Sequence, residues 1–113
     1  MSRKSRSPRK PAPAFVFAAL GDATRLQLVV RLSTGPPRSI AQLTEGSRLT
    51  RQAITKHLRV LEKAAIVYSV RTGRESLFAF QREPIDQARQ YLDRVSEQWD
   101  QALARLKAFV EDE

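Results

Sequence analysis

The sequence predicts a mainly α-helical chain with a small β-hairpin, arranged as a winged helix-turn-helix in the order α-α-α-α-β-β-α. Three observations carry this prediction. A short apolar helix and a basic amphipathic helix, separated by a turn, occupy residues 39–64. Two strand-like segments around Gly73 follow directly. Heptad-spaced apolar residues then run through the C-terminal part of the chain.

Length and charge narrow the class of protein. The chain has 113 residues, enough for one domain, and a formal net charge of +8. The charge is +5 over residues 1–14, +6 over residues 15–80 and −3 over residues 81–113. A surplus of cations on the first two-thirds indicates a nucleic-acid surface, although solubility alone is the simpler explanation. There is no cysteine, which excludes disulfides and thiolate metal sites.

The N-terminal region predicts a tail followed by two helices. Residues 1–13 combine Ser, Pro and cations, so we expect a disordered basic tail that either solubilises the chain or follows a DNA minor groove. The apolar run after it is too short for a signal peptide or a membrane span, so we expect a cytoplasmic protein. A helix over residues 14–20 breaks at Gly21. Asp22 then suits the N-cap of a helix over residues 23–33.

The next two helices form the predicted helix-turn-helix. Ser39 can cap a short helix that contains Ile40 and Leu43, and Thr50 can cap a helix over residues 51–64. In the second helix Ile54, Leu58 and Leu61 form a buried stripe at about 100° per residue. The opposite face carries Gln52, Thr55, Lys56, Arg59 and Lys63. This polar face is either a DNA-reading surface or an ordinary solvated face.

A hairpin and a long helix complete the chain. Residues 66–71 and 76–80 have strand composition, and the turn between them gives a basic wing tip with Arg71 and Arg74. Pro84 suits the first turn of a helix over residues 84–111. The apolar repeat along that helix is longer than one small domain needs, so we expect it to pair with a second copy.

Three motifs resemble the ArsR/SmtB family of winged-helix transcription factors: Leu20-Gly21-Asp22-Ala23-Thr24-Arg25, Thr55-Lys56-His57-Leu58-Arg59-Val60-Leu61, and Arg71-Thr72-Gly73-Arg74-Glu75. Ala23 and Ala65 depart from the family pattern, standing where Pro and Gly are usual. The resemblance implies a homodimer with an interface made by its first and last helices, and repression by blocking promoters.

Metal release of DNA, which is common in the family, does not carry over to this chain. The positions that match a Cys-x-Cys metal site are Ser39 and Ala41, and the last helix has no histidine. The chain therefore looks more like a metal-independent subgroup.

The predicted DNA-contact residues lie on the recognition helix, on the turn before it and on the wing. Its members are Arg48, Thr50, Arg51, Gln52, Thr55, Lys56, His57, Arg59, Lys63, Arg71 and Arg74. Arg51 and Gln52, near the helix N-terminus, suit base edges. Arg48, Arg59 and Lys63 suit phosphates. As a lone histidine, His57 suits a structural or phosphate-contacting role rather than a metal site.

The predicted dimer interface comprises Phe15, Ile85, Ala88, Leu92, Val95, Trp99, Ala102, Leu103, Leu106 and Phe109. The sequence thus predicts a homodimeric repressor that binds a palindromic operator in double-stranded DNA, with no metal and no cofactor. It offers no enzyme constellation and identifies no inducer. A protein-interaction module and a nonspecific nucleic-acid-binding protein are the alternatives.

Overall fold

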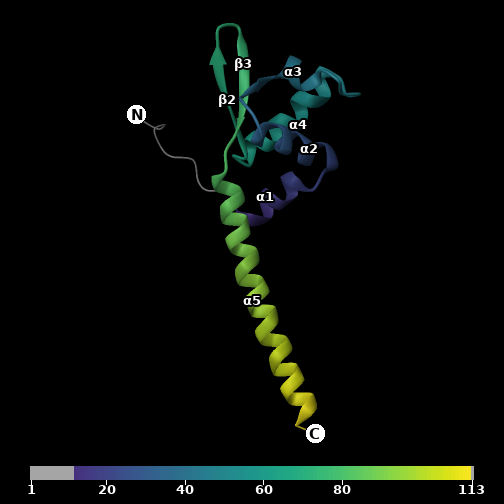
Figure 1. Ribbon diagram of the computed structural model, residues 1–113, viewed down its shortest axis with the longest axis vertical. Helices are drawn as coiled ribbons and strands as arrows, with labels where there is room; N and C mark the ends of the chain where they lie inside the picture. The colour runs from purple at the N-terminus through teal and green to yellow at the C-terminus, as the bar shows by residue number, and fades with distance from the viewer. Residues whose placement is uncertain (1–11, 113) are drawn as a thin grey trace, which may run out of the picture.

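The computed structural model describes residues 12–112. Within this part of the chain the elements follow in the order α1 (Pro13–Leu20), α2 (Ala23–Ser33), β1 (Arg38–Ser39), α3 (Ile40–Thr44), α4 (Arg51–Lys63), β2 (Val67–Thr72), β3 (Glu75–Phe80) and α5 (Glu83–Glu111) (Figure 1). This order and arrangement confirm the predicted winged helix-turn-helix. Pro13 belongs to α1, so the helix begins one residue earlier than predicted. The rest of the predicted tail, up to residue 11, lies outside the described residues.

Three side chains start helices as the sequence predicted. The Asp22 carboxylate accepts a hydrogen bond from the Arg25 backbone N–H at 3.0 Å. The Ser39 hydroxyl accepts from the Gln42 N–H at 3.1 Å, and the Gln42 side chain accepts from the Ser39 N–H at 2.9 Å. Thr50 Oγ1 accepts from the backbone N–H of residue 53 at 3.1 Å. Each bond satisfies a backbone donor that a helix N-terminus leaves unpaired.

The sheet differs from the prediction, because it contains a third strand. β1 pairs antiparallel with β3, with Arg38 opposite Phe78 and Ser39 opposite Leu77, so the strand order is β1-β3-β2. Two residues are too short to show the alternation that identifies a strand in a sequence. β1 thereby joins the start of the helix-turn-helix to the inner edge of the wing.

The core lies where the first four helices meet the base of the hairpin. Leu58 and Leu61 of α4, Leu43 of α3 and Phe78 of β3 are all buried in it. Complete burial of such side chains contributes about 1.5–3 kcal/mol each. The predicted apolar stripe of α4 is thus confirmed, and its burial turns the opposite face of α4 outward.

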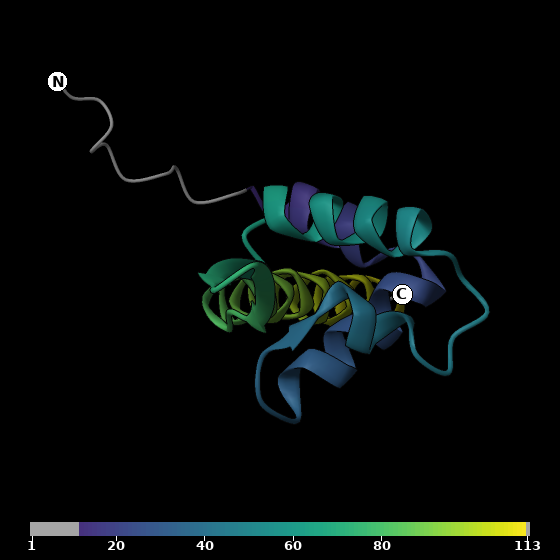
Figure 2. The same cartoon turned by 90° about the horizontal axis from the view of Figure 1, so that it is seen from above.

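The long helix α5 belongs to this core only at its start. Ala88 is 5% exposed, and Ile85 packs partly buried against the same core. Both residues thus attach α5 to its own domain, and their predicted contact with a partner stays a prediction. The whole of α5 is about 43 Å long at 1.5 Å per residue. The part beyond its start projects away from the domain (Figure 1). Seen from above, it runs beneath the helical cluster (Figure 2).

Among the described residues no single helix is long and apolar enough to cross a bilayer; α1 and α2 meet that test only as a pair bent by 98°.

Ala65 ends the recognition helix in a backbone conformation that favours glycine. Its φ is 59°, in the left-handed region. The Ala65 N–H donates to the Glu62 carbonyl at 2.9 Å, and the Ile66 N–H donates to the Leu61 carbonyl at 3.0 Å. These bonds, with Leu61 and Ile66 both buried, form a Schellman motif. The end of α4 therefore requires a residue in the left-handed conformation, and in this chain that residue is an alanine, which carries a Cβ.

Replacing Ala65 by Gly should stabilise the protein by about 1 kcal/mol, because the left-handed conformation is strained for a residue with a Cβ. Urea unfolding measures the change. The matched control is Ala64→Gly, since Ala64 has a φ of −86°. That substitution should destabilise the protein, because glycine adds backbone freedom to the unfolded chain and removes a methyl group that is fully buried in the core. Equal effects of the two substitutions would show that Ala65 is not strained.

Candidate nucleic-acid interface

The outward face of α4 presents the side chains that could read DNA. We call Arg51, Gln52, Thr55, Lys56 and Arg59 the recognition face. Arg51 and Gln52 lie in the first turn of α4, and both are exposed. Lys56 follows on the same side and is also exposed. No hydrogen bond within residues 12–112 engages these three side chains, so they are available to a ligand.

Two hydroxyls of the predicted set are used within the helix. Thr50 Oγ1 is the N-cap acceptor of α4, and Thr55 Oγ1 donates to the Arg51 carbonyl at 2.7 Å. Thr55 is also only partly exposed. Both residues therefore contribute first to the shape of the helix, and their predicted contact with DNA stays a prediction.

Arg59 is held by an ion pair that also reaches the wing. Its Nη1 lies 2.8 Å from Glu62 Oε1, and the Ser69 hydroxyl of β2 donates to Glu62 Oε2 at 3.1 Å. The Arg59 side chain is well exposed, so the pair adds little stability. Glu62 makes both contacts, so it links the recognition helix to β2, the first strand of the hairpin, and thereby affects the geometry of the site. Neither Glu62 nor Ser69 was among the predicted site residues.

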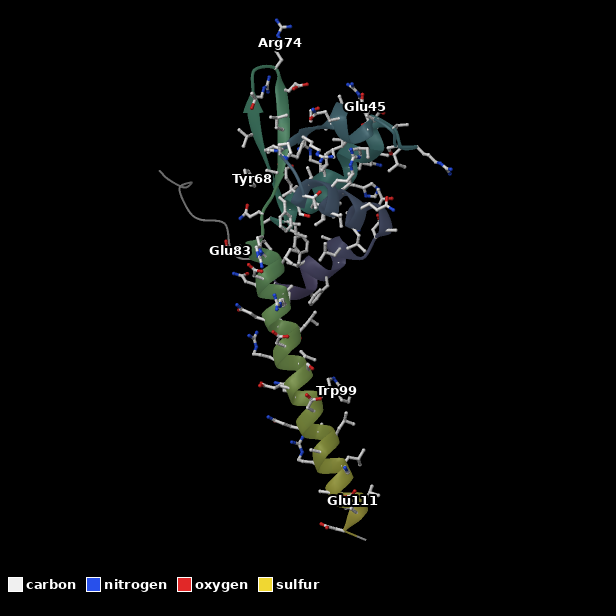
Figure 3. All side chains as sticks on the ribbon, in the orientation of Figure 1. Glu45, Tyr68, Arg74, Glu83, Trp99 and Glu111 are labelled. Carbon is white, nitrogen blue, oxygen red and sulfur yellow. The ribbon has the colours of Figure 1, made fainter. Side chains whose placement is uncertain are left out.

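The wing carries its two arginines at the far end of the hairpin. Gly73 has a φ of 63°, which suits glycine in the tight turn. Arg71 Nε donates to the Gly73 carbonyl at 3.2 Å, so this side chain folds back along the turn. Arg74 points outward from the tip (Figure 3). The other cations of the predicted set, Arg48 on the turn before α4 and Lys63 at its end, are exposed.

His57 lies at a junction of three helices, α1, α2 and α4. It is less exposed than most side chains of the recognition face. Its Nδ1 is 3.2 Å from Arg25 Nη1 and 3.9 Å from Asp22 Oδ2. A guanidinium only donates, so Nδ1 is the acceptor and the ring proton is assigned to Nε2. Of the two roles predicted for His57, this geometry supports the structural one.

Arg25 contacts every member of this junction. Its Nε donates to the Ala19 carbonyl at 2.6 Å and its Nη2 to the Ala18 carbonyl at 3.4 Å, both at the end of α1. Its backbone N–H donates to Asp22. In the sequence, Arg25 stood out only as part of a motif. The signal was present in that motif, but the partner His57 is 32 residues away.

The same contacts shift the ionisation of Asp22. The hydrogen bond from the Arg25 backbone N–H lowers the pKa of the Asp22 carboxyl below its ordinary value. Partial desolvation opposes this, and the nearby charge of Arg25 lowers the pKa further. Asp22 therefore stays ionised as the cap of α2 at neutral pH.

Between residues 12 and 112 no group of three or more His, Cys, Asp or Glu side chains is arranged to hold a metal ion.

The chain matches known helix-turn-helix proteins. A family model described as a helix-turn-helix domain matches residues 20–70. The HTH-type transcriptional regulator YuzN of Bacillus subtilis, itself uncharacterized, is 40% identical over 76 residues, which cover 62% of this chain and 83% of YuzN. The HTH-type transcriptional regulator Rv2034 of Mycobacterium tuberculosis is 28% identical over 102 residues, covering 90% of this chain and 92% of Rv2034.

The same relationship appears in three dimensions. A solved ArsR-like transcriptional regulator from Rhodococcus sp. RHA1 is 34% identical to this chain and superimposes with a TM-score of 0.77. The superposition covers 86% of this chain and 91% of the Rhodococcus protein. The likeness therefore extends beyond the helix-turn-helix to most of the architecture described above.

The lowered pKa of Asp22 predicts a loss of stability in acid. A carboxylate whose folded pKa lies below its unfolded pKa stabilises the fold above the unfolded value, and this contribution is lost as the pH falls through the folded value. Asp22→Asn keeps a capping oxygen but cannot ionise. Wild type should thus lose stability relative to Asp22→Asn below about pH 4. Urea unfolding of both proteins across this range tests it, and parallel curves would contradict it.

Proposed function

Since the chain belongs to the ArsR family of helix-turn-helix transcriptional regulators, we propose that it is a homodimeric repressor that reads a palindromic operator without a metal ion. The chain is a DNA-binding transcriptional regulator by family. The observation that carries the finer proposal is one recognition helix per chain combined with a projecting helix that exposes large apolar side chains from Leu92 to Val110.

The recognition face suits the major groove. α4 has one face in the core and the other turned outward, an α-helix has the width that the groove admits, and the N-terminal turn of α4 presents Arg51 and Gln52. An arginine can bond guanine through two donors, and a glutamine can bond adenine through a donor and an acceptor. These two side chains would read bases, and Lys56 would follow along the same strand.

Cations around this face suit the phosphate backbone. Arg48 lies on the turn before α4, and Lys63 lies at its end, so the two are placed on either side of the inserted helix. Arg74 projects outward from the wing tip (Figure 3), where it would meet the neighbouring groove. Phosphate contacts set the register of the protein on DNA, whereas base contacts select the sequence.

The part of α5 beyond Ala88 supports a homodimer. Seven large apolar side chains of this helix are 40–69% exposed: Tyr91, Leu92, Trp99, Leu103, Leu106, Phe109 and Val110. Covering them would bury on the order of 800 Å² per protomer, which is one partner's share of a standard interface. A soluble protein rarely leaves so large an apolar face exposed to water, and a second copy of the chain offers an identical face to cover it.

A two-fold dimer gives the two recognition helices a fixed separation. Half-sites would then lie about one helical turn apart, roughly 34–36 Å, and the operator would share the symmetry of the protein. Occupation of such a site within a promoter excludes polymerase, which is the simplest route to repression. Ser39 and Ala41, at the positions that resemble a thiolate site in the family, offer no strong metal ligand, which supports metal independence.

Arg51→Ala and Gln52→Ala should each relax sequence preference at particular base pairs, at a cost of about 1–3 kcal/mol for the preferred site. Lys63→Ala is the matched control, because losing a phosphate contact should weaken all sequences alike. Selection from a randomised DNA library, with EDTA present, measures both effects and yields the operator.

Three results of this selection would contradict the proposal. Unchanged sequence profiles in both variants would remove Arg51 and Gln52 as base readers. A wild-type protein without any sequence preference would indicate nonspecific nucleic-acid binding. Recovery of binding only after Zn²⁺ is added would contradict metal independence.

Trp99→Asp should prevent dimerisation and thereby abolish tight operator binding. Trp99 is 63% exposed in the protomer and projects from the free part of α5, so the substitution should leave the domain folded (Figure 3). In the dimer it would bury an unpaired carboxylate, at a cost of several kcal/mol. Separate half-site contacts no longer reinforce each other in a monomer. Light scattering and a gel shift on the same sample measure both effects.

Gln101→Asp is the control for this experiment. It introduces the same charge on α5 two residues away, about 200° around the helix from Trp99. We expect this variant to stay dimeric and to bind the operator. A dimeric Trp99→Asp protein with normal DNA binding would show that α5 does not pair through this seam.

A further inference from the structure

Arg25 connects three helices through one side chain. Its guanidinium donates to two carbonyls at the C-terminal end of α1 and to His57 of α4, while its own backbone starts α2. Each of the three guanidinium nitrogens is therefore bonded inside the protein. The cation also lies at the end of α1 where the helix dipole is negative, which favours this placement.

The Arg25 side chain lies between α5, the helix of the proposed dimer seam, and α4, the recognition helix. α1 packs along the first part of α5, where the rings of Phe17 and Tyr91 are 6.3 Å apart. From α1 the Arg25 guanidinium continues to His57, which is on the second turn of α4. α5 is thus connected to α4 through the rings of Phe17 and Tyr91, the C-terminal end of α1 and the Arg25 guanidinium, which bonds both α1 and α4.

We propose that Arg25 is a positioning residue for DNA recognition: it sets the direction of α4 relative to α1 and α5 without touching DNA. The inference rests on the proposed dimer, because the direction of α4 relative to the seam then determines which half-site spacing both recognition helices can reach together. Arginine is required, since its planar fork reaches the α1 carbonyls and His57 at once. A lysine keeps the charge but offers a single ammonium.

Arg31 provides a matched control on the same helix. Its Nη1 donates to the Leu43 carbonyl at 2.9 Å and its Nη2 to the Gln42 carbonyl at 3.3 Å. It makes the same kind of bond as Arg25, but both of its side-chain hydrogen bonds go to α3, so it ties α2 to α3. A purely structural role for both arginines would make their lysine variants behave alike.

The experiment measures the affinity of wild type, Arg25→Lys and Arg31→Lys for the selected operator, for versions with one or two base pairs added or removed between half-sites, and for a single half-site. All measurements are made at several salt concentrations and at a temperature where circular dichroism shows every variant folded. His57→Leu, which breaks the link from the α4 side, is included in case Arg25→Lys does not fold.

Arg25→Lys and His57→Leu should lower the ratio of affinities for correctly spaced over misspaced operators by about tenfold or more, equivalent to about 1.4 kcal/mol per tenfold. Arg31→Lys should keep the wild-type ratio. Because no phosphate contact is lost, the dependence of affinity on salt should stay the same in Arg25→Lys.

Two results would overturn the inference alone. A wild-type spacing ratio in folded Arg25→Lys and His57→Leu would show that the junction does not direct α4. A uniform loss of affinity with a salt slope smaller by about one would show that Arg25 binds a phosphate. If wild type itself showed no spacing preference, the proposed two-fold reading of DNA would fail, and this inference would fail with it.

Discussion

Burial of one face of α4 is the constraint on which the interface depends. Ile54, Leu58 and Leu61 enter the core at helical spacing, so the helix cannot rotate about its axis without exposing them. Arg51, Gln52 and Lys56 consequently face outward, whatever the wing or α5 do. The apolar contacts that stabilise the domain therefore also decide which polar side chains a groove can meet.

The long helix divides one apolar repeat between two tasks. Ile85 and Ala88 are used within the protomer, whereas Trp99 and the apolar residues beyond it remain exposed. A heptad pattern gives no sign of this division, because an apolar side chain has the same spacing whether its partner is in the same chain or in another. The division attaches α5 rigidly at one end and leaves the rest for assembly.

Features set by neighbouring residues were predictable, and features set by distant pairs were not. Asp22, Ser39 and Thr50 cap their helices as predicted, because a cap bonds a backbone group two or three residues away. The strand β1 and the bond between Arg25 and His57 depend on segments that are far apart in sequence. Local rules thus recovered the elements and most of the recognition face, while the junction that orients this face required the structure.

The interface combines a preset frame with adaptable side chains. Glu62 joins Arg59 to Ser69 of β2, and Arg25 joins α4 to α1, so the recognition helix is held on two sides before any ligand arrives. Such pre-organisation lowers the ordering cost of binding. A phosphate that binds Arg59 must compete with Glu62. Arg59 therefore contributes to the free energy of DNA binding only the difference between its contact with the phosphate and its contact with Glu62. Arg51 and Lys56 have no such competitor within the described residues, so on the recognition face the favourable electrostatic contribution to binding concentrates on them.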